Sequence, residues 1–209
     1  SNATNTARIA AIANTADIVG NVVSQRFIPA VIRRYRMISP NTSSFTYNDI
    51  KDDIFVTGSG GAANGFDVSN PNSASIYTYR ETTAGGRGWV AVTNINQTLN
   101  PATGAIVFVR GDRTLPAPQW YTAPFVAQNE VNMDFVGPVN KGTYSPTITF
   151  TNTGVIDNDG WNLVGNPYPS QIDWSLVNKT NLTPFVYSLD PTTNAYVVND
   201  GMTPIASGQ

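Results

Sequence analysis

Short stretches in which hydrophobic and polar residues alternate recur along the chain. Residues 33–38 alternate in this way, and further strand-like runs lie at 54–56, 76–79, 89–95 and 105–109. Runs of this kind, bounded by Gly, Pro, Asn and Asp, are typical of strands in antiparallel sheets. The pattern therefore predicts an all-β protein made of antiparallel β-sandwich units, with no helix longer than about two turns.

The segment 160–174 has the most distinctive pattern, Gly-Trp-Asn-Leu-Val-Gly-Asn-Pro-Tyr-Pro-Ser-Gln-Ile-Asp-Trp. We expect it to begin as a strand with Trp161 and Leu163 on one face. The prolines that follow fix φ, remove backbone donors and restrict the residues before them. We therefore predict that Trp161 is buried and that residues 166–170 form an ordered loop. The residues alone leave open whether this loop presents a binding site.

Several segments of the chain resemble a known family. Residues 160–174 resemble the GWNLVGNPYPSxIDW signature of large secreted and cell-surface proteins of the Bacteroidetes type. Residues 20–29, 34–40 and 104–113 resemble further segments of the same family, although Tyr35 stands where that family usually has Trp. Such proteins are commonly exported by the type IX secretion system. The resemblance implies a β-rich extracellular module without a known activity.

An apparent internal repeat suggests how the chain is divided. Residues 76–79 parallel residues 184–187, and residues 89–90 parallel residues 196–197. Duplication of one β-unit fits these parallels. The predicted divisions are an expression-tag remnant at 1–3, the end of a preceding β-element at 4–29, a first β-unit at 30–117 and a second, C-terminally truncated β-unit at 118–209. We expect residues 205–209 to enter a strand that is cut off.

Composition narrows the possible functions. Charged residues make up 12% of the chain, about half of the usual fraction, which is roughly 25%. The net charge of −2 and the pI near 4.9 argue against a nucleic-acid partner. No apolar run approaches the roughly 20 residues of a membrane span, so no membrane insertion is expected. The absence of Cys and His removes thiol chemistry, disulfides and the most common general base.

Aromatic side chains are the candidate ligand-binding groups. Rings in β-sandwiches are more often part of the core than of a binding site, so solvent exposure distinguishes the two roles. Coplanar exposed rings beside amides would indicate sugar binding. The candidate platform consists of Trp120, Tyr121, Tyr168, Trp174 and Tyr196.

Acidic residues offer weaker candidates. Asp157 and Asp159 alternate before Gly160, but no nearby Glu closes a calcium loop, so calcium is a weak candidate and no other cofactor is expected. The spacing singles out no glycosidase pair among the other carboxylates considered, which are Asp67, Glu81, Glu130, Asp173 and Asp190. Residues 110–112 spell Arg-Gly-Asp, which we interpret as a turn at Gly111 with its charged side chains in solvent. Together with the missing His and Cys, this predicts that the chain is not an enzyme.

The favoured interpretation is a non-catalytic extracellular structural or adhesion module of a larger secreted or cell-surface protein. Its partners would be neighbouring domains of the same chain. The alternative is a carbohydrate-binding module that holds glycans or other surface polymers on exposed aromatic rings. Low charge makes electrostatic capture of a partner weak, and loops rich in amides and hydroxyls suit neutral ligands.

Overall fold

A computed structural model gives the fold of residues 15–82, 88–116 and 120–199, together with residues 2, 4, 7–10, 12 and 13. The described part of the chain is all-β, as the alternating runs predicted, and its helices are single 3-10 turns. The strands are β1 (Val22–Ile28), β2 (Arg34–Ile38), β3 (Ile76–Arg80), β4 (Gly88–Ala91), β5 (Ala105–Val109), β6 (Val131–Gly137), β7 (Val186–Asp190) and β8 (Ala195–Asn199). The 3-10 turns are η1 (Tyr47–Ile50), η2 (Gly61–Asn64), η3 (Ile156–Asn158) and η4 (Trp174–Leu176). No helix in these residues is long and apolar enough to cross a membrane.

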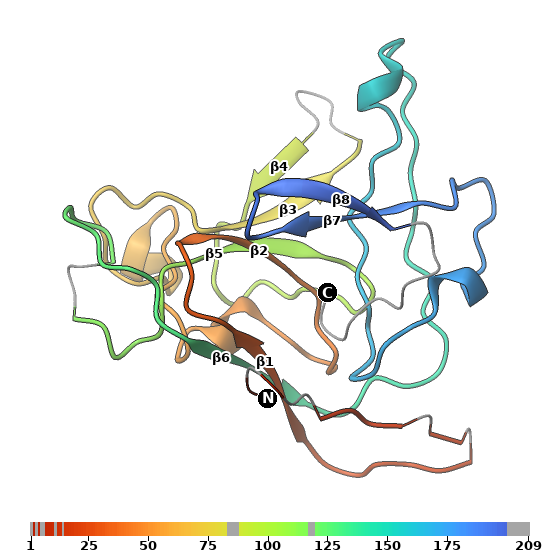
Figure 1. The fold of residues 1–209 in the computed structure, drawn as a ribbon, viewed down its shortest axis with the longest axis horizontal. Coiled ribbons are helices and arrows are strands. Elements are labelled where there is room, and N and C mark those ends of the chain that lie inside the picture. Colours follow the sequence, from red (N-terminus) through yellow and green to blue (C-terminus); the bar gives the residue numbers. More distant parts are fainter. Residues whose placement is uncertain are drawn as a thin grey trace.

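The strands form three antiparallel sheets that are consistent with a β-sandwich. The central sheet has four strands in the order β2-β5-β3-β4, and the other two sheets are the pairs β1-β6 and β7-β8. In Figure 1 the β1-β6 pair runs below the central sheet, and the β7-β8 hairpin overlaps it in the view. The hairpin touches the central sheet, because β7 contacts β2 and the Arg34 guanidinium donates to the backbone oxygens of Pro191 and Thr192.

The main core contains residues of both β1-β6 and the central sheet. β6 shows the required alternation, since Val131, Met133 and Phe135 are buried between exposed or half-buried neighbours. Ile76 of β3 and Val107 of β5 are paired in register and belong to the same buried cluster. The cluster also includes residues of the loop between β2 and β3, such as those of η1. A single core therefore draws on both sides of the predicted boundary at residues 117–118, and the duplication stays a prediction.

The opposite face of the central sheet is aromatic. Tyr35 contacts Phe108 and Tyr77 edge-on, with ring centroids 5.1 and 6.0 Å apart. Tyr79 and Trp89 are cross-strand partners whose centroids lie 5.3 Å apart. These rings are half-buried or exposed, unlike the aliphatic side chains of the core.

The segment 160–174 departs from its predicted conformation in one respect. Trp161 does not begin a strand and is not buried: its side chain is 44% exposed. Pairing is confined to Val164, which forms an isolated bridge with Thr103, so no neighbouring strand covers the indole. The ring instead contacts Tyr187 of β7, and its Nε1–H donates to the backbone oxygen of Asp157 at 2.9 Å.

The proline loop that follows is fixed by hydrogen bonds and close contacts. The Asn166 amide is buried; its Nδ2 donates to the backbone oxygen of Ser170 at 2.6 Å, and its Oδ1 accepts from the backbone N–H of Tyr168 at 2.9 Å. The Asn140 amide donates to the backbone oxygen of Pro167 at 2.8 Å. A side chain at Gly165 would collide with Ser39, since a Cβ there would lie 2.2 Å from the Ser39 Cβ. The loop therefore packs closely against the residues that follow β2.

Other strand predictions were right in part. β2, β3 and β5 lie where the alternation placed them. The run at 89–95 forms a strand only as far as Ala91, and the run at 54–56 contributes one isolated bridge at Ile54. Residues 205–209 lie outside the described residues.

Candidate functional site

Both tryptophans of the predicted platform are buried. Trp120 is 7% exposed and stacks on Phe55 with centroids 4.6 Å apart, and its backbone oxygen accepts a hydrogen bond from Arg33 at 3.0 Å. Trp174 is 9% exposed, and its Nε1–H donates to the backbone oxygen of Pro184 at 2.6 Å. Neither indole presents a face on which a ligand could stack.

The tyrosines of the platform lie in different surroundings. Tyr121 stacks on the same Phe55 ring as Trp120. The Tyr168 hydroxyl donates to the backbone oxygen of Gly142 at 2.6 Å, and its ring meets Tyr144 edge-on. Tyr196 is 56% exposed on β8. Ring contacts therefore bring together only Trp120 and Tyr121 among the predicted residues.

The acidic pair considered for calcium belongs to residues 146–163, which protrude from the sheets and which we call the protruding arm (Figure 1). The two carboxylate oxygens of Asp159 accept hydrogen bonds from the backbone N–H and the hydroxyl of Thr153, at 2.9 and 2.6 Å. Asp157 interacts through its backbone oxygen with the Trp161 indole. Within the described ranges, no group of three or more acidic side chains is arranged to hold a metal ion.

Four of the carboxylates considered for glycosidase chemistry are bonded to the framework. Asp67 forms a two-pronged ion pair with Arg113, with both N···O distances at 2.9 Å. Asp173 accepts from the backbone N–H and hydroxyl of Ser175, and these bonds hold its pKa below the ordinary value. Asp190 accepts in the same way from residues 192 and 193, which also lowers its pKa.

Glu81 has the most unusual position among these acids. It is buried at the end of β3 and joins the protruding arm to the central sheet, because it accepts from the backbone N–H of Thr151 at 2.7 Å and from that of Gly160 at 3.3 Å. Burial acts to raise the pKa of Glu81, but the hydrogen bonds from Thr151 and Gly160 outweigh it, so the pKa lies below its ordinary value.

The Arg-Gly-Asp tripeptide is tied into the surrounding structure. The Arg110 guanidinium lies 4.9 Å from the centroid of the Phe108 ring, and burial lowers its pKa to about 10. The Asp112 carboxylate accepts from the backbone N–H and hydroxyl of Thr114 and from the Asn129 amide. Both charged side chains are thus held by neighbours and are half-buried, not free in solvent as predicted. Asp112 forms an isolated bridge with Ile54, and the turn follows at residues 113 and 114.

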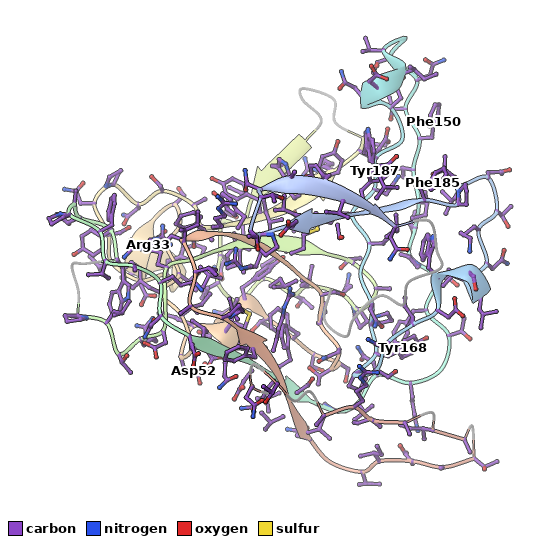
Figure 2. All side chains as sticks on the ribbon, viewed as in Figure 1. Arg33, Asp52, Phe150, Tyr168, Phe185 and Tyr187 are labelled. Carbon is purple, nitrogen blue, oxygen red and sulfur yellow. The ribbon has the colours of Figure 1, made fainter. Side chains whose placement is uncertain are left out.

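Apart from Tyr196, sequence reasoning missed an exposed group of rings around the β7-β8 hairpin. Trp161 and Tyr187 are both exposed, with centroids 5.1 Å apart and ring planes at 74°. Phe185 precedes Tyr187 by two residues, so both should point to the same face, and Figure 2 shows them on the same side as Phe150, away from Arg33. We call Phe150, Trp161, Phe185, Tyr187 and Tyr196 the aromatic surface.

Register explains why Tyr196 belongs to this surface. Tyr187 pairs with Val198, and Leu189 pairs with Tyr196, so all four side chains project from one face of the hairpin. Tyr196 and Val198 are exposed. The signal in the sequence was the unbroken hydrophobic run at 195–198, which leaves apolar side chains on both faces of a strand that buries little.

A groove of about 320 Å³ adjoins the aromatic surface at Asn162. Its walls come from the end of β3, from the loop before β5 and from both extended segments of the protruding arm. Hydroxyl and amide side chains dominate the walls, with one tyrosine. We call this the hydroxyl groove; its principal lining residues are Tyr79, Thr98, Asn100, Thr147, Thr149 and Asn162.

A second and wider groove, of about 910 Å³, lies near β6 and is lined by Asp52, Asp53, Asp112 and Glu130 among others. Burial raises the pKa of Asp53 to about 6; the backbone N–H of Asp134 acts against this rise, and the carboxylates of Asp134 and Asp52 add to it. The Asp53 carboxylate also accepts from the backbone N–H of Asp134 at 2.6 Å. Asp53 and Asp112 thus have structural partners.

The fold and these surfaces define an all-β module whose loops are tied to its sheets and whose exposed rings gather near a polar groove. The chain belongs to a family described as a domain of unknown function (DUF8693), whose model matches residues 55–200. The match includes the central sheet from β3 onward, the aromatic surface and the hydroxyl groove. No curated protein and no solved structure matches the chain.

Proposed function

We propose that the chain is a non-catalytic structural or adhesion module of a larger, exported cell-surface or secreted protein of the Bacteroidetes type. The resemblance of residues 160–174 to the signature of such proteins supports the setting. The partners in this proposal are neighbouring domains of the same protein and polymers at the cell surface.

One observation carries the non-catalytic part of the proposal: four of the five candidate carboxylates serve as framework ligands. Asp67 pairs with Arg113, Glu81 anchors the protruding arm, and Asp173 caps η4. A glycosidase needs one carboxylic acid and one carboxylate directed at a shared substrate. Carboxylates that are saturated by backbone N–H groups and by arginine are poorly placed for that work, because proton transfer would break the bonds that hold the loops.

The structural part is supported by the way in which the proline loop is attached. The buried amides of Asn140 and Asn166 bond to backbone oxygens within or beside the loop. Buried amides bonded in this way fix a loop in one conformation, because leaving them unbonded costs free energy. A stiff module of this kind suits a surface protein built from repeated units.

The test is adhesion under multivalent display. Beads carrying many copies of the chain should adhere to bacterial or polymer-coated surfaces far better than the monomer, with a gain of about 10²-fold or more. The same preparation should release no product from polysaccharides. Turnover of any polysaccharide would refute the non-catalytic assignment, and equal adhesion of chain-coated and uncoated beads would refute adhesion.

A further inference from the structure

The aromatic surface and the hydroxyl groove meet at one short stretch of chain. Trp161 belongs to the aromatic surface, and the next residue, Asn162, lines the groove. Phe150 packs over Gly160, since a Cβ on that glycine would lie 2.8 Å from the Phe150 ring. The groove and the exposed rings are therefore neighbours at residues 161 and 162.

The wall of the groove beside Trp161 is held in place before any ligand binds. The Asn162 Oδ1 accepts from the backbone N–H of Thr149 at 3.1 Å, and its Nδ2 donates to the backbone oxygen of Thr149 at 2.9 Å. This pair of bonds joins the two segments of the arm, which run side by side. Glu81 ties the same arm to β3, so the groove has fixed walls on both sides.

Polar groups in the groove remain available to a ligand. Thr98, Asn100 and Thr147 have exposed side chains, and none of them forms a side-chain hydrogen bond within the part of the chain that the structure describes. The charged lining residues are Arg80 and Glu81, one of each sign. The lining thus offers hydroxyls and an amide without a net charge.

We propose that the hydroxyl groove binds a neutral oligosaccharide, one sugar unit of which stacks on the corner formed by Trp161 and Tyr187. The volume of about 320 Å³ is at the lower end of the roughly 300–1,000 Å³ of small-molecule sites, which suits one or two sugar rings. Sugars have an apolar C–H face that packs on aromatic rings and hydroxyls that bond to amides and hydroxyls. Tyr and Trp offer both an apolar body and a polar edge.

This inference rests on the proposed adhesion function and names its ligand class. Adhesion to an apolar protein surface would use the aromatic surface alone and leave the groove empty. The continuity of exposed rings with free hydroxyls and an amide is what favours a sugar, because a purely apolar partner would leave those polar groups without hydrogen bonds.

The experiment measures binding of the purified chain to neutral oligosaccharides, namely glucan, mannan, xylan and chitin fragments, by calorimetry, with an acidic galacturonan fragment for contrast. At least one neutral oligosaccharide should bind. Trp161→Ala and Tyr187→Ala should each weaken its binding about tenfold, since each removes one stacking ring. Thr147→Val should weaken binding about threefold by removing one exposed hydroxyl.

Phe125→Ala is the matched control, because Phe125 is an exposed ring beside Arg33, and Figure 2 places Arg33 far from Tyr187. It should leave the affinity unchanged. Circular dichroism and a urea midpoint for each variant separate loss of the site from loss of the fold.

Four results would overturn the inference. The first is no binding of any neutral oligosaccharide, and the second is preferential binding of the acidic fragment. The third is binding that Trp161→Ala, Tyr187→Ala and Thr147→Val all leave intact. The fourth is bead adhesion that no oligosaccharide inhibits but that Trp161→Ala abolishes in saccharide-free buffer. This result would show that the aromatic surface docks a protein, so the sugar site would fail while the adhesion function stands. Loss of the adhesion function itself would appear separately, as beads that adhere to nothing.

Discussion

The ion pair between Asp67 and Arg113 allows a quantitative test of the claim that the carboxylates are framework ligands. The Asp67 side chain is largely buried, and besides Arg113 it accepts from the backbone N–H of Val56 at 2.7 Å. Arg113 also donates to the backbone oxygen of Ile54 at 3.0 Å. The pair therefore joins the loop before β3 to the turn after β5.

The expected cost of Asp67→Ala follows from these contacts. Loss of the acceptor leaves the buried Val56 N–H unsatisfied, which costs about 1–3 kcal/mol. Loss of the ion pair adds about 1 kcal/mol, because Arg113 is 33% exposed, is partly screened by solvent and keeps its bond to Ile54. The sum is about 2–4 kcal/mol, or a decrease in Tm of roughly 5–15 °C for a chain of this size.

Urea unfolding of the variants in a double-mutant cycle separates the hydrogen bond to Val56 from the ion pair with Arg113. Asp67→Asn keeps an oxygen for the Val56 N–H but removes the charge, so it should cost only about 1 kcal/mol. Asp67→Ala, Arg113→Ala and the double variant should show a coupling energy of about 1 kcal/mol. A cost below about 1 kcal/mol for Asp67→Ala, together with zero coupling, would refute the framework role and reopen Asp67 as a functional acid.

Further predictions concern the tryptophans, the groove near β6 that Asp53 lines, and the proline loop. Trp174→Ala should lower the free energy of unfolding by about 3 kcal/mol and Trp161→Ala by about 1 kcal/mol, because only the Trp174 ring is buried. Equal losses for the two variants in urea unfolding would contradict this difference in burial. The raised pKa of Asp53 means that the folded state binds the Asp53 proton more tightly than the unfolded chain does. Protonated Asp53 therefore contributes to the free energy of unfolding, fully below about pH 4, and this contribution is lost as the pH rises through about 6. Asp53→Asn should therefore remove this loss of stability and raise the free energy of unfolding at pH 7 by about 1 kcal/mol after allowance for solvent screening. If the free energy of unfolding of the variant depends on pH as that of the unmodified chain does, the prediction fails. Gly165→Ala should cost about 1–3 kcal/mol through collision with Ser39, and an unaltered Tm would show that the loop can move away.

The exposure of Trp161 shows why the burial of this ring was predicted wrongly. A tryptophan in an alternating run is usually buried, but only when a neighbouring strand covers its face. Here pairing is limited to Val164, and the indole meets Tyr187, which lies 26 residues further along the chain. No local pattern encodes that contact. The same holds for Trp120, whose burial depends on Phe55.

Local features were determined by the sequence itself. Alternation with a period of two in 34–38 specifies a strand, since side chains of a strand point alternately to its two faces, and the short runs of apolar and aromatic residues at 76–80 and 105–109 specify two more. Asp173, for example, accepts a hydrogen bond from the backbone N–H of Ser175, which is only two residues away. Bonds of such short range need no tertiary partner, so the sequence is sufficient to predict them.

Only the tertiary structure decided which rings are exposed and which acids are bonded. The arm anchored by Glu81, the pairing of β1 with β6 and the corner between Trp161 and Tyr187 all join residues distant in sequence. Their energies depend on solvent exclusion and on distances between separate segments, which arise only when the sheets have packed. The alternating pattern thus determined an all-β chain, whereas the packing of its layers determined where that chain can bind.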